Sequence, residues 1–322
     1  MAVFPNASCL GFCDWMLNVS WQTLTPSRLN LIQSIYTAAL NGTSVSDQDY
    51  NNFIQVSSWR EPYYLTWLSN STPFSLPPIG TCDIWFSAAY LQKDISNAYG
   101  IVSFNNTVTR INSVNGSGYY ALNALPARNP YLCVDTSKTF TSKSFAFNQS
   151  GVQNFQVQNF GTLTQNITGY TLFVVANNNT LSVNNWAFYF SANTSAGKSR
   201  IGLMVNSSNN WTGQAIRLDA DVQGTIGGAA ASKNMQIICL TVDYSTGIGK
   251  MYNNGVLTTT NPALTSMGST SNTACFAVSV GSLNQGNIWN GLISDCLSFQ
   301  TALSDADVLT ITEWLNSMRR VY

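Results

Sequence analysis

The sequence predicts a mainly β protein, in which a β-sandwich follows a small helical N-terminal extension and a helix closes the chain. From Cys82 onward, short runs of β-branched and aromatic residues alternate with Asn, Gly and Ser clusters that favour turns. Helical spacing of apolar residues is confined to the two ends of the chain. Charged residues make up only 9% of the 322 residues, so solubility comes from Asn, Ser, Thr and Gln, which suit turns and strand edges.

The N-terminal part predicts two short helices. The first begins at Thr25-Pro26, where Thr is the N-cap and Pro occupies the first turn, and it ends at Asn41-Gly42. The second begins at Ser46-Asp47. The apolar face of the first helix is expected at Leu29, Ile32, Tyr36 and Leu40.

An aromatic, irregular stretch then leads to Pro77-Pro78 and Gly80, which mark a domain boundary. We therefore expect a helical, aromatic-rich assembly segment at 1–79 and a β-sandwich at 80–322. The segment is too rich in aromatics to cover them by itself, and such density is typical of obligate interfaces. Its aromatic residues include Trp15, Trp21, Trp59, Tyr63, Tyr64 and Trp67.

The strands expected in 80–322 are short and are separated by turn signals at near-regular spacing, as in sandwiches and barrels. Asn254-Gly255 is the strongest turn, because this dipeptide accepts the positive φ angles of a tight hairpin. The predicted strand segments are DIWFSA, SFAFN, FQVQNF, YTLFVVAN, WAFYFSA, RIGLMVN, QAIRLDAD, MQIICLTVDY, the two arms of KMYNNGVL, CFAVSVG and WNGLISDCLSF.

A helix is expected to end the chain. Ser304 is its N-cap, Asp305 and Asp307 stand at the positive end of the helix dipole, and Arg319 and Arg320 stand at the negative end. An apolar stripe should pack this helix on the sandwich; it consists of Val308, Ile311, Leu315 and Met318.

Two C-terminal segments in this order resemble the laminin-G-like, concanavalin A-like jelly-roll superfamily, of the kind found in phage and large-virus virion proteins. QIICLTVDYSTGIGKMYNNGVL (236–257) is similar to its strand, Asp-x-x-x-Gly turn and Tyr-x-Asn-Gly hairpin, and WNGLISDCLSFQTALSDADVLTITEWL (289–315) to its last strand and following helix. DIWFSAAYLQKD and YTLFVVANN occupy the positions of its opening and middle strands. The resemblance covers about residues 80–322 and implies two curved antiparallel sheets packed face to face. It does not imply one function, because this fold serves lectins, adhesive modules, glycanases and viral surface proteins.

Catalysis is not expected. Polysaccharide-cutting enzymes of this fold resemble one another in a strand with two glutamates around an aspartate, because two carboxylates must flank the scissile bond. Here the only glutamates are Glu61 and Glu313, in neither case within that motif, and the chain has no histidine for a triad or a zinc site.

Composition also excludes several partners. The formal net charge of zero argues against nucleic acid and against anionic membrane surfaces. No apolar stretch approaches the roughly 18 residues of a membrane span, and the start MAVFPNASCLGFCDWMLN lacks the basic region of a signal peptide. The seven scattered cysteines are expected to be reduced thiols in apolar positions, with Cys9 and Cys13 as the pair most open to another role.

Two groups of residues are candidates for ligand binding. Arg217, Asp219 and Asp221 in QAIRLDAD would share one face of a strand, and the two carboxylates could be oxygen ligands for calcium; the alternative is a solvated, self-compensated strand face. Trp211, beside Asn210 in the polar stretch NSSNNWTGQ, could stack on a sugar, anchor a protein interface or simply be packed. Four other tryptophans lie on strand or helix patterns and are expected in the core: Trp85, Trp186, Trp289 and Trp314.

The leading functional hypothesis is a non-catalytic virion structural or surface protein of the capsid-decoration, spike or tail-fibre type. The N-terminal segment would bind other virion proteins in an oligomeric assembly, and a lectin-like domain would contact host-surface glycans. Such a protein is made in the host cytoplasm and resides in the virion. The alternatives are a free carbohydrate-binding lectin and, third, a polysaccharide-active enzyme with an unfamiliar site. No cofactor is expected apart from calcium at Asp219 and Asp221.

Overall fold

The computed structural model describes most of the sandwich and part of the N-terminal region. The chain forms two compact units, Met1–Ser75 with Tyr90–Ile95 and Leu76–Ala89 with Ser96–Tyr322. No helix among the described residues is long and apolar enough to cross a membrane. The described residues are 2–3, 13, 17, 25–41, 43–57, 78, 82–88, 100–104, 107–115, 117–122, 130–135, 142–179, 183–192, 195–283, 287–319 and 321.

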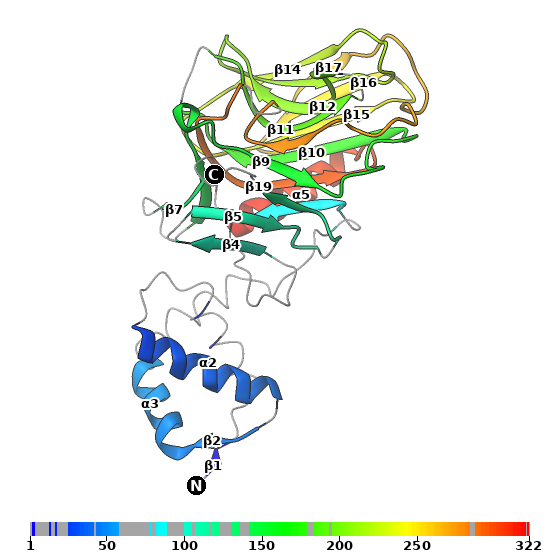
Figure 1. Cartoon of the computed structure of the whole chain (residues 1–322). Coiled ribbons are helices and arrows are strands. Elements are labelled where there is room, and N and C mark those ends of the chain that lie inside the picture. Colours follow the sequence, from blue (N-terminus) through cyan, green and yellow to red (C-terminus); the bar gives the residue numbers. More distant parts are fainter. Residues whose placement is uncertain are drawn as a thin grey trace. The chain divides into compact units, whose positions relative to one another are not determined.

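The first unit contains the two predicted helices. Helix α2 (Pro26–Asn41) and helix α3 (Asp47–Ser57) have the predicted starts, and a short antiparallel pair joins β1 (Ala2–Val3) to β2 (Val45–Ser46) (Figure 1). The hydroxyl of Ser46 caps α3 by accepting the backbone N–H of Asp49 at 3.0 Å.

The predicted apolar face of α2 is partly wrong. Leu29 is 43% exposed, whereas Ile32 and Ile35 are fully buried in a small cluster with Cys13 and Phe53. The cluster contacts α2 through Ile32 and Ile35, so the first turn of α2 is exposed to solvent. The aromatic residues predicted to make interfaces at positions 15, 21, 59, 63, 64 and 67 lie outside the described residues.

The second unit is the β-sandwich. All strand pairs in its described part are antiparallel (Figure 1). One sheet, here called sheet one, has β10 and β19 at its centre, and β19 pairs on its other side with β3 and β8. Its order is β17 (Val256–Pro262), β16 (Ile248–Asn253), β15 (Gln236–Asp243), β10 (Gly169–Ala176), β19 (Gly291–Phe299) and β3 (Ile84–Ser87).

The opposing sheet, here called sheet two, is longer. At its end β5 also pairs with β4 (Gly100–Phe104) and with β7 (Tyr131–Asp135), and β7 leads through β8 (Ser142–Phe147) back to β19 of sheet one. Its order is β14 (Gly224–Ala230), β13 (Asn210–Ala215), β12 (Ser195–Val205), β11 (Asn185–Ala192), β18 (Val278–Val280), β9 (Phe155–Gln158), β6 (Tyr120–Leu122) and β5 (Thr107–Asn112).

The core lies between these two sheets. Tyr170 of β10 and Phe190 of β11 contact across it, with ring centroids 5.3 Å apart. At β13 the sheets approach so closely that a Cβ on Gly213 would lie 2.6 Å from the side chain of Leu240 of β15, so a larger residue would displace that side chain. The predicted mainly β fold, a sandwich of two antiparallel sheets with a helical N-terminal extension and a C-terminal helix, is confirmed.

The hairpin between β16 and β17 has the predicted turn. Asn254 has φ 51° and Gly255 has φ 80°, which are the positive values of a tight two-residue turn. The side-chain oxygen of Asn254 also accepts the backbone N–H of Ile237 at 2.8 Å, so the turn is fixed to β15.

Helix α5 (Asp305–Arg319) packs on sheet one through the predicted residues Val308, Ile311 and Leu315, which are fully buried (Figure 1). Ser304 is its N-cap, because its hydroxyl accepts the N–H of Asp307 at 3.2 Å.

The C-terminal end of α5 is held by a buried ion pair that the sequence did not reveal. Arg319 donates through Nε to one oxygen of Asp295 at 2.5 Å and through a terminal nitrogen to the other at 2.8 Å. Trp85 donates to the same carboxylate at 3.2 Å and packs edge-on against Trp314 of α5. The Asp295 side chain is fully buried. Burial alone would raise the pKa of Asp295, but the neighbouring Arg319 holds it below its usual value.

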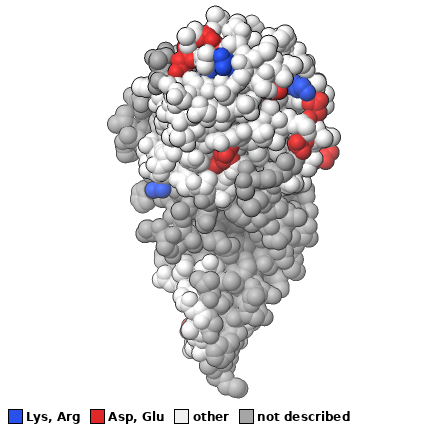
Figure 2. Space-filling model, turned by 90° about the vertical axis from the view of Figure 1, so that its right-hand side faces the viewer, with Lys and Arg blue, Asp and Glu red and all other residues white. Residues whose placement is uncertain are grey.

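The surface carries few charges. On the face in Figure 2, the charged side chains of the described residues stand singly or beside an opposite charge, and most of the described surface is neutral. The five cysteines whose side chains are described are buried free thiols, as predicted, and Cys9 lies outside the described residues; the five are Cys13, Cys82, Cys239, Cys275 and Cys296.

Candidate functional site

The predicted cluster of Arg217, Asp219 and Asp221 lies in a loop and not on a strand face. Strand β13 ends at Ala215 and β14 begins at Gly224, so all three residues belong to the β13–β14 loop, residues 216–223. The carboxylate of Asp221 accepts the backbone N–H of Leu218 at 3.0 Å. This bond closes a turn, so the N–H of Leu218 is not used in strand pairing. The prediction of a shared strand face is therefore wrong.

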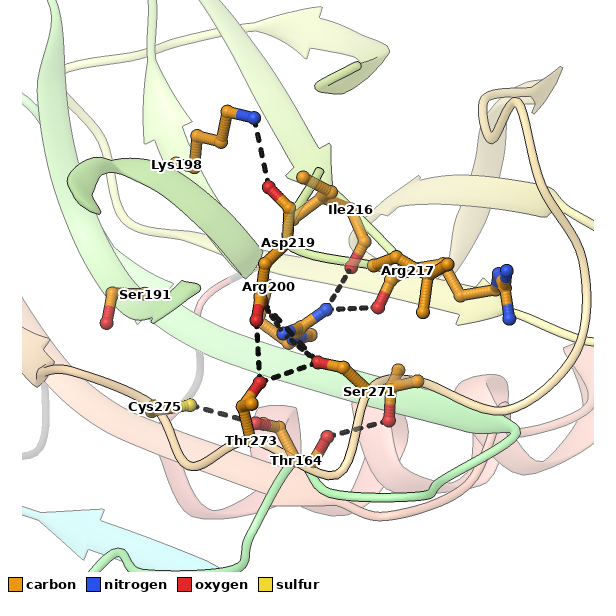
Figure 3. Close-up of polar contacts among 12 residues, drawn as sticks. Thr164, Ser191, Lys198, Arg200, Ile216, Arg217, Asp219, Ser271, Thr273 and Cys275 are labelled. Atoms are coloured by element: carbon orange, nitrogen blue, oxygen red, sulfur yellow. Dashed lines mark hydrogen bonds and ion pairs between the residues drawn. The ribbon is translucent and has the colours of Figure 1, made fainter. Parts of the chain in front are cut away.

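The loop is organised around Arg200 of β12, whose side chain is 1% exposed (Figure 3). Its guanidinium donates to the carbonyls of Ile216, at 3.3 Å, and of Arg217, and it pairs with the carboxylate of Asp219. It also donates to the hydroxyl of Ser271 at 2.6 Å. One buried cation thus joins strand β12, the β13–β14 loop and the segment before β18.

The second carboxylate oxygen of Asp219 extends this network. It accepts from the Thr273 hydroxyl at 2.7 Å, and Thr273 contacts Ser271 at 2.8 Å (Figure 3). Beyond it, the Cys275 thiol lies 2.8 Å from the hydroxyl of Thr164. Burial raises the pKa of Cys275 to about 11, so this thiol is protonated and poorly nucleophilic at neutral pH.

The oxygens that were expected to bind calcium are engaged by donors of the chain itself. Lys198 donates to the backbone carbonyls of Asp219, at 3.0 Å, and of Asp221, at 3.2 Å. The carboxylate of Asp219 faces Arg200, and that of Asp221 accepts from Ser266. Within the described part of the chain, no group of three or more acidic, cysteine or histidine side chains could hold a metal ion. The cations that contact the oxygens of this loop are therefore Lys198 and Arg200 of the chain itself.

Arg217 is partly exposed, as are Asp219 and Asp221. Its Nε donates to the hydroxyl of Ser266 at 2.8 Å, and one terminal nitrogen donates to the carbonyl of Ser269 at 3.0 Å. These bonds hold the guanidinium against residues 266–269; the same loop and this segment also carry Val222 and Met267, which are 71% and 64% exposed. Arg217 is thus positioned by the loop and reachable from solvent.

Trp211 is not an exposed contact residue, which corrects its sequence-based placement in a polar loop. It lies on β13, is fully buried, donates from its indole N–H to the side-chain oxygen of Gln236 at 2.9 Å and packs against Trp289 at 5.3 Å between ring centroids. The polar stretch before it is a turn in which Asn206 accepts the backbone N–H of Asn210 at 3.0 Å. Of the three roles considered for Trp211, the structure supports ordinary packing.

The structure also separates the candidates into two groups. Asn210 begins β13 and the β13–β14 loop follows its end, so Asn210 and Arg217 lie at opposite ends of a six-residue strand, roughly 20 Å apart at about 3.3 Å per residue. The sequence reasoning missed the two residues that organise the buried charges, Arg200 and Asp295. Each is a charge inside an apolar strand segment, which signals a buried partner.

No known family model and no curated protein matches the sequence. Among solved structures, the chain is similar to the CBM40 of the Ruminococcus gnavus IT-sialidase bound to α2,3 sialyllactose, with 16% identity, a TM-score of 0.39, and coverage of 47% of this chain and 85% of that one. It is also similar to Trypanosoma rangeli sialidase in complex with the inhibitor DANA, with 11% identity, a TM-score of 0.47, and coverage of 84% and 39%. The binding domain of botulinum neurotoxin DC in complex with SialylT gives 14% identity, a TM-score of 0.45, and coverage of 69% and 52%. At such TM-scores the assignment of the fold rests on the strand pairing described above.

Proposed function

We propose that this chain is a non-catalytic binding protein: a structural or surface component of a virion, of the capsid-decoration, spike or tail-fibre type, with a lectin-like sandwich. The observation that carries the non-catalytic part is that six of the described aspartates of the sandwich serve the fold. Asp219, Asp295 and Asp305 are paired with Arg200, Arg319 and Lys250. Others bind their own turns and caps; they are Asp221, Asp243 and Asp307.

Glycoside hydrolysis needs one carboxylic acid and one carboxylate on either side of the scissile bond. Glu313 cannot supply such a pair, because it is exposed on the outer face of α5. A carboxylate held by a buried cation is stabilised in its ionised form and is a poor proton donor at neutral pH. These groups therefore suit the maintenance of loop shape better than proton transfer.

The proposed binding surface is the β13–β14 loop. Its backbone is held by Lys198 and Arg200, and a preorganised loop loses little conformational entropy on binding. Arg217 offers N–H donors beside the hydroxyl of Ser266, and the same loop exposes Val222; donors and apolar surface suit the hydroxyls and apolar faces of a sugar. The ligand class that we propose is a host-surface glycan.

The virion assignment is supported by the neutral, Asn/Ser/Thr-rich surface and by the separate helical unit, which we propose attaches the protein to other virion proteins in an oligomeric assembly. A free cellular lectin is the second candidate, because the residues of the proposed binding surface all belong to the sandwich. Genes for capsid, portal or tail proteins beside this one would support the virion role, and a polysaccharide-utilisation cluster would contradict it.

The binding surface is tested with Arg217→Ala on a glycan array that includes sialyllactose. We expect weaker binding without a change in melting temperature, because Arg217 is partly exposed. Asn210→Ala is the matched control at the opposite end of β13 and should leave binding unchanged. Unchanged binding in Arg217→Ala, or equal loss in both variants, would rule out this loop as the binding surface.

A further inference from the structure

Phe276 is an exposed aromatic residue in the segment that precedes β18. It is 60% exposed, whereas the adjacent Cys275 and Ala277 are 7% and 6% exposed. Aromatic side chains present a large flat surface with few rotatable bonds, which suits contact with a ligand. A single exposed apolar side chain is nevertheless common on protein surfaces, so the support and the surroundings of the ring decide whether it suits a ligand.

The residues on both sides of Phe276 are held by hydrogen bonds. The Cys275 thiol lies 2.8 Å from the hydroxyl of Thr164 (Figure 3). Ala277 donates its N–H to the hydroxyl of Ser191 at 2.7 Å, and its carbonyl accepts the N–H of Ser191 at 2.8 Å. Phe276 therefore projects from a segment that is anchored on both sides, and such a residue loses little conformational entropy when a ligand covers it.

The same segment is joined to the β13–β14 loop. The backbone N–H of Ser271 donates to the carbonyl of Arg217 at 3.3 Å, and the hydroxyl of Thr273 donates to Asp219 at 2.7 Å. Thr273 precedes Phe276 by three residues, which span at most about 11 Å of extended chain. The exposed ring thus belongs to the same group of loops as the proposed binding surface.

The strand register also places Phe276 and Arg217 at one end of sheet two. One row of register partners crosses four strands, from the first residue of β18 to the last residue of β13: Val278, Phe190, Ile201 and Ala215. Because neighbouring strands lie about 4.8 Å apart, this row spans roughly 14 Å. Phe276 precedes the row by two residues and Arg217 follows it by two. One extended ligand can therefore contact both side chains.

The surface around Phe276 consists of neutral polar groups. Neither segment 160–168 nor segment 263–277 contains a charged residue. The two segments meet where the backbone N–H of Asn166 donates to the carbonyl of Ser271 at 3.2 Å, and the side chains of Asn166 and Asn272 are exposed. Amide groups both donate to and accept from hydroxyl groups. A flat apolar ring beside exposed amides matches the C–H face and the hydroxyls of an uncharged sugar.

We propose that Phe276 is a second sugar-contact residue: one unit of a glycan stacks on its ring while another unit of the same glycan binds at the β13–β14 loop beside Arg217. This assignment rests on the proposed function and extends it, because it specifies the ligand as an uncharged oligosaccharide of more than one unit. A monosaccharide reaches one of the two contacts, whereas a longer chain reaches both.

The test is isothermal titration of the full-length protein with uncharged oligosaccharides of glucose, mannose, galactose and xylose, each from one to six units long. In the wild type, we expect the affinity for at least one series to rise with chain length. Phe276→Ala should remove this rise and weaken the binding of the longer chains by about tenfold. Arg217→Ala should weaken the binding of short and long chains alike.

Three further variants control for the chemistry of the ring. Phe276→Trp should retain the affinity because it keeps an aromatic face, whereas Phe276→Leu should lose it although leucine is also apolar. Val256→Ala is the matched control and should bind like the wild type, because Val256 is 67% exposed and lies at the end of β17 away from segment 263–277. Melting temperatures should stay unchanged in all variants, since the replaced side chains are exposed.

Three outcomes would overturn the assignment. If Phe276→Ala binds every oligosaccharide like the wild type while Arg217→Ala binds weakly, Phe276 is no sugar contact and the proposed function stands. If Phe276→Ala changes the sedimentation of the protein and leaves oligosaccharide binding unchanged, the ring belongs to a protein interface. If no oligosaccharide binds to the wild type, the assignment and the proposed function both fail.

Discussion

Replacement of Trp211 by alanine tests whether this residue is packed in the core or contacts a ligand. The indole is fully buried, donates a hydrogen bond to Gln236 at 2.9 Å and packs on Trp289. Truncating a buried tryptophan to alanine costs about 3–5 kcal/mol. For the roughly 240-residue sandwich, this corresponds to a fall in melting temperature of about 6–20 °C. We therefore expect Trp211→Ala to lower stability strongly, whatever ligand is present.

Trp211→Phe is the matched control, since it retains an aromatic ring and loses the N–H donor. The side-chain oxygen of Gln236 still accepts the backbone N–H of Ser232 at 3.0 Å, so no buried acceptor is left unpaired. The expected cost is roughly 1–2 kcal/mol. The assay is urea unfolding. An unchanged slope of the unfolding free energy against urea concentration shows that the variants still unfold in a two-state transition. An unchanged stability in Trp211→Ala, together with lost glycan binding, would refute the packing role and restore the exposed contact.

Three further predictions follow from the buried charges and from the helical unit. Asp219→Ala removes the only carboxylate that the described residues pair with the guanidinium of Arg200, and it should cost about 3 kcal/mol in urea unfolding. Calcium or EDTA should leave the wild-type melting temperature unchanged, and a stabilisation by calcium would mean that the loop binds the metal. Arg319→Ala should cost about 3–5 kcal/mol because the fully buried carboxylate of Asp295 loses its cation, and a cost below about 1 kcal/mol would show that the ion pair does not hold α5. A fragment of residues 1–79 should be unfolded or aggregated, because the described core of this unit is one small cluster; a monomeric fragment that melts cooperatively would contradict this.

Local sequence signals predicted the elements whose structure depends on neighbouring residues. The starts of α2 and α5 follow from the Pro at position 26 and the cap at Ser304, and the hairpin follows from Asn254-Gly255. Each of these signals operates within a few residues and needs no distant partner. The same holds for most of the long apolar strands of the sandwich.

Long-range effects explain what the sequence did not reveal. Trp211 is buried because Gln236 and Trp289, distant in sequence, cover it. The Gly-rich β14 has low strand propensity but pairs with β13, where sheet contact selects small residues. The pattern of QAIRLDAD predicts charges on one strand face. In the structure, the buried Arg200 binds Ile216 and Asp219 and holds this segment as a loop. A pattern of alternating residues does not show which distant cation a carboxylate will meet.

In the proposed function, the sandwich binds glycans without converting them. The most direct measurement is to incubate the purified full-length protein with β-glucans, alginate, carrageenan and sialyllactose, and to measure both retention on the protein and new reducing ends or unsaturated products. We predict that at least one glycan is retained and recovered intact. New products that disappear in Asp219→Asn or Asp221→Asn would contradict the claim and would locate a catalytic site in the β13–β14 loop.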